Sequence, residues 1–167
     1  MASSSQWAAG YAQQADADFK MFQSLERDSS VQECHKLQFL QMACEKLVKA
    51  HLCTEGQNRA SLQTRHAFIK AHLPVILRQQ AVFVNFTGPK ATEALHRARH
   101  LAQEIEVLAP AVKRGGMRPD NCEYPWEDNL GALHIPLDWS FYPSQLIILP
   151  AGRTILKLIR GAIERIV

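Results

Sequence analysis

The sequence predicts an all-α fold: an up-and-down bundle of four to five helices, with an irregular cap rich in proline and aromatic residues before the last helix. Three observations support this prediction. Apolar residues recur three and four positions apart over long segments, as on one face of a helix. Helix-breaking residues separate these segments, and five of the eight prolines lie between residues 112 and 150. At 167 residues, we expect a single domain over residues 1–167.

The first two helices are predicted from their apolar stripes and their end signals. The first runs over about residues 6–27, and the serines at 3–5 are candidate N-caps. Ser30 and Glu33 have the spacing of a capping box, in which each side chain bonds a backbone N–H of the other residue. The second helix therefore starts there and extends to about residue 52, with Gly56 as a residue that closes it.

Three further segments complete the predicted architecture. Residues 59–84 carry a helical stripe interrupted by Pro74, which should kink that helix or split it. Pro89, in the first turn, opens a fourth helix that ends at Ala109 and Pro110. A fifth helix spans about residues 151–167.

The segment from 112 to 150 has too many prolines for a long helix and too many aromatic residues for a free linker. We interpret it as a cap whose aromatic side chains pack on the bundle. The alternative is a stacking platform for bases. The residues concerned are Trp126, Trp139, Phe141 and Tyr142.

Composition and charge restrict the class of protein. The hydrophobic fraction of 47% is too high for a disordered chain. The net charge of +3 permits contact with RNA without indicating it. The four cysteines form no C-x-x-C pair, so we expect reduced thiols. No signal peptide and no membrane-spanning run is visible, so we expect a cytoplasmic protein that does not bind membranes.

The second predicted helix carries the residues of a known family signature. Its run of Gln41, Glu45, Lys46, Lys49 and Ala50 resembles the second-helix signature of HEPN domains (higher eukaryotes and prokaryotes nucleotide-binding domains).

Two later features agree with this resemblance. His66 falls where many such domains have a histidine at the start of their third helix, and Tyr124-Pro125 resembles the tyrosine-proline pair of their late loop. The matched features together span most of the chain.

The family includes ribonucleases and inactive members. Its nucleases use an Arg-x4–6-His motif near the start of a late helix, with two copies that meet across a dimer interface. This sequence departs from that pattern, because no histidine follows His134. Only Arg59 with His66 and Arg65 with His72 have a matching spacing, and both pairs come early in the chain.

The resemblance therefore implies a non-catalytic binding or assembly component. It implies a homodimer, a nucleotide or RNA as ligand, and a nucleotidyltransferase-type or other RNA-handling protein as partner. One alternative is a metal-independent ribonuclease of the toxin–antitoxin kind with a displaced site. The other is a purely structural helical bundle.

The candidate catalytic residues are Arg65, His72 and His66. An arginine beside a histidine has the means to stabilise a phosphate and move a proton. The competing interpretation places Arg65 and His72 on the solvated outer face of the third helix. For His66, the competing interpretation is a partly buried ring whose nitrogen meets a backbone or carboxylate acceptor. One such acceptor is Asp18, a lone carboxylate on the apolar face of the first helix.

The candidate ligand-binding residues form two groups. Glu45, Lys46 and Lys49 are expected on the exposed side of the second helix, with an ion pair between Glu45 and Lys49 four positions apart. A basic group in the cap has the charge to bind phosphate through a glycine-rich turn, or is a solvated loop. Its members are Lys113, Arg114 and Arg118. We expect no cofactor and no metal.

Overall fold

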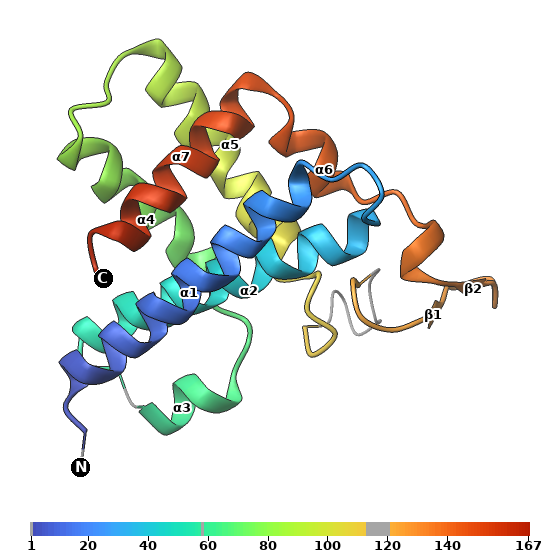
Figure 1. Cartoon of the computed structure of the whole chain (residues 1–167), viewed down its shortest axis with the longest axis horizontal. Coiled ribbons are helices and arrows are strands. Elements are labelled where there is room, and N and C mark those ends of the chain that lie inside the picture. The colour runs from blue at the N-terminus through green and yellow to red at the C-terminus, as the bar shows by residue number, and fades with distance from the viewer. Residues whose placement is uncertain (1, 58, 113–120) are drawn as a thin grey trace.

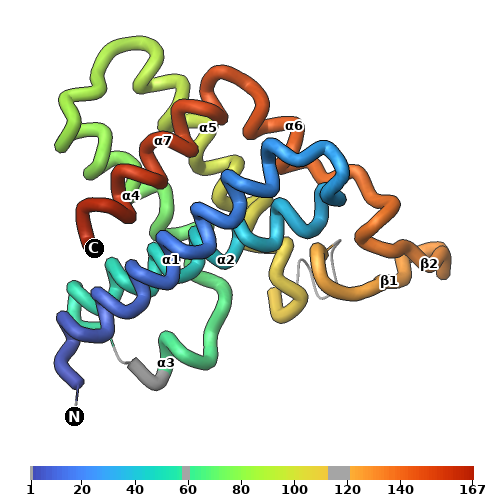
Figure 2. The backbone as a smooth tube through the Cα atoms, in the orientation of Figure 1, coloured from blue at the N-terminus to red at the C-terminus, as the bar shows by residue number. Residues whose placement is uncertain are grey.

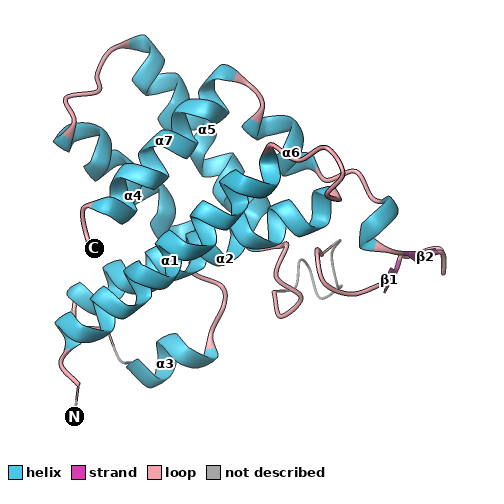
Figure 3. Cartoon of the chain, in the orientation of Figure 1, coloured by secondary structure: helices cyan, strands magenta, loops and turns pink. Residues whose placement is uncertain are grey.

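The computed structural model describes residues 2–57, 59–112 and 121–167. The chain forms a helical bundle, as predicted, and strands occupy only a small hairpin near one edge of the described structure (Figure 3). No helix within the described residues is both long and apolar enough to cross a membrane.

Helices α1 (Ser4–Glu26) and α2 (Glu33–Thr54) lie side by side and run in opposite directions (Figure 1). The N-terminal prediction for α1 is confirmed: Ser3 caps the helix, and Ser3 and Gln6 each accept a hydrogen bond from the other's backbone N–H. The predicted close of α2 is also confirmed. Gly56 has a φ of +79°, and the next residue, Gln57, donates its backbone N–H to Leu52 O at 3.0 Å, as in a Schellman motif.

The predicted capping box of α2 is wrong. The helix starts after Gln32, and no side chain caps it. The Ser30 hydroxyl donates to Asp28 at 2.6 Å instead. Glu33 is also engaged elsewhere, because its carboxylate accepts the backbone N–H of Phe141 at 2.8 Å, at the start of a distant helix.

The third predicted helix is divided, but not at Pro74. Helix α3 (Arg59–Thr64) ends well before this proline, and α4 (Ile69–Phe83) continues through it. Pro74 lies near the start of α4, so only a bond to a first-turn carbonyl is lost. Buried Glu106, from a later helix, accepts the backbone N–H of Lys70 at 2.9 Å and thereby caps the new helix start.

Helices α5 (Pro89–Glu106) and α7 (Pro150–Glu164) pack with α4 beside the α1–α2 pair (Figure 2). Pro89 begins α5, as predicted. The main core combines the apolar faces of these helices. Its largest fully buried side chains include Phe22, Leu37, Leu40, Leu47, Ile69, Leu73, Leu101 and Phe141.

In the described part of the cap, between α5 and α7, the elements are short. Strands β1 (Trp126–Glu127) and β2 (Leu133–His134) pair antiparallel, with Trp126 opposite His134. A 3₁₀ turn (Pro136–Asp138) and α6 (Tyr142–Ile147) follow. Phe141 lies in the core and Trp139 packs against it, which confirms that these two aromatic residues hold the cap on the bundle. Trp126 is buried within the cap, against Trp139 and His134. Tyr142 is exposed.

Candidate functional site

The candidate site is built around Glu45, in the middle of α2. Gln41 and Lys49 lie one turn before and after it, on the same face of the helix. The Gln41 amide donates to Glu45 Oε2 at 3.0 Å, and Lys49 Nζ lies 2.7 Å from Oε1. All three residues are buried. Two donors from its own helix therefore hold the carboxylate in place.

A third contact to Glu45 comes from His66, in the connection between α3 and α4. His66 Nδ1 lies 3.2 Å from both carboxylate oxygens. An ionised carboxylate only accepts hydrogen bonds, so the Nδ1 proton belongs to this contact and Nε2 is left for a ligand or solvent. A His66 ring nitrogen does meet an acceptor, as the competing interpretation expected, but the acceptor is Glu45 and not Asp18.

The surroundings keep Glu45 ionised. Burial by itself would raise the pKa of this carboxyl group. The hydrogen bond and the charge of Lys49 act in the opposite direction, with help from Gln41 and His66. Their combined effect is larger than that of burial, so the pKa of Glu45 lies below its usual value.

Asp18 has a different partner from the one expected. It is buried on α1, and it forms an ion pair with Lys46 of α2. The Lys46 side chain is 22% exposed. This pair fixes the position of Lys46 beside the Glu45 cluster.

The expectation that Glu45 and Lys49 lie on the exposed side of α2 is wrong. Their residue exposures are 9% and 5%. The reason is the central place of α2, which is contacted by α1, α4, α5, α6 and α7 and therefore has buried residues on most of its circumference. The expected ion pair between Glu45 and Lys49 is confirmed.

A pocket of about 450 Å³ opens beside this cluster. Glu45, Lys46 and His66 line one part of it, and residues 109–111, Glu123 and Tyr124 line another. Tyr124 is 53% exposed. The pocket thus brings together the signature residues of α2, the histidine and the late tyrosine, which are far apart in the sequence. Its volume is within the range of small-molecule sites.

Arg65 and His72 do not share one unbroken helix. Arg65 lies in the connection before α4, and His72 lies within α4. Both nevertheless pack on Phe68. The Arg65 guanidinium carbon is 5.4 Å from the centre of the Phe68 ring, and the ring centres of Phe68 and His72 are 6.4 Å apart. This arrangement places a cation and an imidazole near one aromatic ring.

The basic group of Lys113, Arg114 and Arg118 lies outside the described residues. In the described part of the chain, no group of three or more histidine, cysteine, aspartate or glutamate side chains is placed to hold a metal ion.

Sequence reasoning missed a polar cluster in the cap. Asp128 accepts backbone N–H groups from Leu130 and Ala132, both at 2.9 Å, and lies 2.9 Å from His134 Nε2. These bonds, led by the one to His134, lower the pKa of Asp128 to about 2. The sequence signal for this turn is Asp128 with Gly131 three positions later. Gly131 has a φ of +81°.

Comparison of the chain with protein-family models, with curated proteins and with solved structures finds no match.

Proposed function

We propose that this chain is a HEPN-like domain that acts as a non-catalytic binding or assembly component. It would work as a cytoplasmic homodimer beside a nucleotidyltransferase-type or other RNA-handling partner. The pocket beside Glu45 is its proposed ligand site, and the proposed ligand is a nucleotide or a short RNA.

The observation that carries this proposal is the arrangement of Lys46, His66 and Tyr124 around one pocket. An exposed tyrosine ring offers a face on which a base stacks, and such stacking tolerates any base. Lys46 supplies a cation near phosphate, and His66 Nε2 supplies a hydrogen-bonding atom. Glu123 also lines the pocket and is suited to accept hydrogen bonds from sugar or base donors.

The state of Glu45 favours binding over catalysis. A general acid or base at neutral pH usually has a pKa shifted towards neutrality. The pKa of Glu45 is shifted the other way, and its oxygens are already occupied by Gln41, Lys49 and His66. Glu45 therefore acts as a fixed acceptor that orients the imidazole.

The test is titration of the protein with a fluorescent adenine nucleotide and with a labelled RNA of a few nucleotides. Tyr124→Ala should weaken binding about tenfold, because stacking of one base contributes about 1–3 kcal/mol. His66→Ala should also weaken it. His51→Ala is the matched control, because His51 lies on α2 but pairs with Glu55 outside the pocket. Absence of binding by the wild-type protein would favour the purely structural bundle.

A second experiment separates binding from cleavage. The second candidate is the ribonuclease, whose candidate residues Arg65 and His72 both contact Phe68. Purified protein is incubated with total RNA, with and without a chelator, beside the His72→Ala variant. The binding component leaves RNA intact in every sample. Cleavage that is unaffected by the chelator and lost in His72→Ala would establish the ribonuclease.

Assembly is tested separately. Sedimentation equilibrium should give twice the mass of the chain, and purification under native conditions should retain the partner protein. A monomer that purifies alone would contradict the assembly part of the proposal. The ligand-binding part is tested independently by the titrations.

A further inference from the structure

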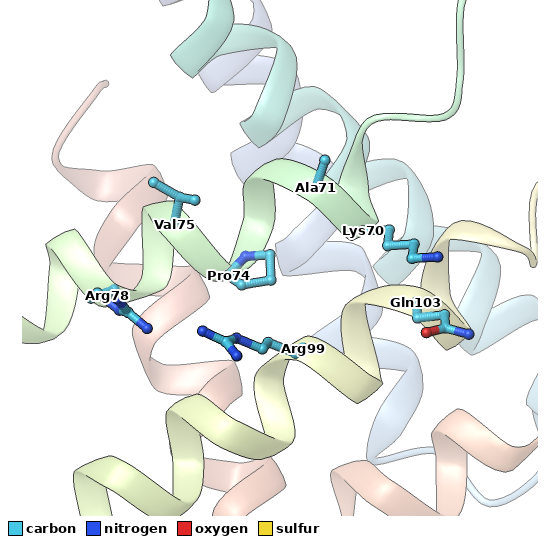
Figure 4. A pocket seen from close by; sticks show the side chains of 7 residues that line it. All are labelled: Lys70, Ala71, Pro74, Val75, Arg78, Arg99 and Gln103. Carbon is cyan, nitrogen blue, oxygen red and sulfur yellow. The ribbon is translucent and has the colours of Figure 1, made fainter.

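A second pocket, of about 430 Å³, lies between α4 and α5 (Figure 4). Lys70 and Arg78 enter it from α4, and Arg99 and Gln103 enter it from α5. On each helix these residues are four or eight positions apart, so they form two polar rows that face one another across the groove. No lining residue is shared with the pocket beside Glu45.

The charge of this groove has one sign. Three of the side chains that line the groove are cationic, and no carboxylate is among the lining side chains. The carboxylate of Glu106 is nearby but buried, and it already accepts the backbone N–H of Lys70. Figure 4 shows Arg78 and Arg99 extending toward each other beneath Pro74.

Arg78 and Arg99 lack the kind of partner that most described arginine side chains have; Arg27, at the end of α1, is the other described arginine without one. In the described part of the chain, most arginine side chains have an acidic or aromatic partner; these are Arg65, Arg97, Arg153, Arg160 and Arg165. Arg78 and Arg99 have neither kind of partner among the described residues, and both are exposed in the same groove. Two like charges that converge repel each other, and an anion placed between them removes that repulsion.

The rest of the lining limits the kind of anion. Pro74 and Val75 form an apolar surface next to the cations. The groove is also larger than a bare phosphate ion requires, since pockets of about 300–1,000 Å³ typically hold small organic molecules. Guanidinium groups bind phosphate oxygens in pairs of parallel hydrogen bonds.

We propose that the α4–α5 groove is a binding site for a phosphorylated small molecule. Arg78 and Arg99 bind its phosphate group, Lys70 adds a third positive charge, and the apolar part of the ligand lies on Pro74 and Val75. This site is separate from the pocket beside Glu45 and does not depend on the function proposed for that pocket.

The test uses three probes in calorimetric titrations: inorganic phosphate, phenyl phosphate and phenol. Phenyl phosphate should bind more tightly than inorganic phosphate, and phenol should not bind. Arg78→Ala and Arg99→Ala should each weaken phenyl phosphate binding about tenfold or more, as expected when a charge-assisted hydrogen bond is lost. Both side chains are exposed, so the fold should tolerate either change.

Two control variants make the result specific. Arg97→Ala removes an arginine from α5 whose partner is Glu93 and which does not line this groove. His51→Ala removes a side chain of α2 that pairs with Glu55 and lines neither pocket. Both variants should bind phenyl phosphate with a Kd within about twofold of the wild-type value. This is well below the tenfold change in Kd, about 1.4 kcal/mol, expected for the groove variants.

The proposal would be overturned by either of two results. One is the absence of saturable binding of phenyl phosphate to the wild-type protein. The other is binding that survives unchanged in the Arg78→Ala, Arg99→Ala double variant. Equal affinity for phenyl phosphate and inorganic phosphate would contradict the role of Pro74 and Val75. The groove would then be a site for an inorganic anion and not for a phosphorylated small molecule.

Discussion

Lys49 Nζ lies 2.7 Å from Glu45 Oε1, and both residues are buried on the same face of α2. A buried ion pair adds little net stability when intact, because both ions have lost their water. Removal of one member is costly, because the other remains as an uncompensated buried charge. The pair therefore makes the candidate site sensitive to single substitutions.

The first prediction concerns Glu45→Gln. The amide keeps the shape of the side chain but leaves Lys49 without its counter-ion, so the free energy of unfolding should fall by about 3 kcal/mol. Urea denaturation followed by circular dichroism measures this change. Glu55→Gln, which removes a half-exposed carboxylate at the end of α2, should change the free energy by less than about 0.5 kcal/mol. Equal effects of the two substitutions would contradict the buried-pair argument.

The second prediction concerns pH. The folded-state pKa of Glu45 lies below its ordinary value of 4.5. Its contribution to stability is therefore complete above pH 4.5 and is lost as the pH falls through the lowered folded-state pKa. Unfolding measured at a series of acidic pH values should show a steeper loss of stability in the wild type than in Glu45→Gln. Parallel curves for the two proteins would rule out this role of Glu45.

The third prediction concerns the cap hairpin. The pKa of Asp128 is lowered to about 2, so its bonds to His134 and to the turn are intact above its ordinary value of 3.8 and are lost towards pH 2. Trp126 stacks on His134, with ring centres 5.7 Å apart. Tryptophan fluorescence should therefore change in this acidic range. Asp128→Asn should weaken that change while the helical circular dichroism signal at neutral pH stays constant.

The fourth prediction distinguishes packing from binding in the cap. Trp126 is only 6% exposed and contacts Trp139 edge to face, with ring centres 5.2 Å apart. Trp126→Ala should lower the free energy of unfolding by about 3 kcal/mol, as for other large buried aromatic residues. Leu130→Ala, in the same hairpin but 94% exposed, should have almost no effect. A stable Trp126→Ala protein would refute the packing role.

The fifth prediction concerns the contact between α6 and α7. A Cβ atom on Gly152 would lie 2.1 Å from the backbone oxygen of Leu146 and 2.6 Å from the Cα of Ile147. Backbone atoms cannot move aside as a side chain does, so Gly152→Ala should cost about 1–3 kcal/mol. Gly10→Ala is the control, because a Cβ there meets nothing within 4 Å. Thermal unfolding of both variants provides the comparison.

Much of the fold was predictable because helix formation leaves local signals. The apolar stripes, the Ser3 cap, Gly56 and Pro89 each depend on residues within a few positions, and the structure bears out these expectations. The capping box at Ser30 and Glu33 failed for two reasons: Ser30 bonds Asp28 nearby in the chain, and Glu33 binds the distant start of α6. The division between α3 and α4 likewise depends on Glu106, which caps α4 from another helix.

The candidate site shows the same limit more clearly. Its individual residues were visible in the sequence: Glu45, Lys46, His66 and Tyr124. Their convergence on one pocket, and the choice of Glu45 over Asp18 as the partner of His66, were not. The groove with Arg78 and Arg99 could not be predicted from the sequence, because these residues come from separate helices, α4 and α5.

The sequence by itself determined the all-α class, the approximate helices and the aromatic cap, since periodicity and end signals act between near neighbours along the chain. Only the tertiary structure decided which charged residues are buried, which of them pair, and where pockets open. Those properties depend on how helices pack, and packing joins residues whose separation in sequence carries no information about their distance in space.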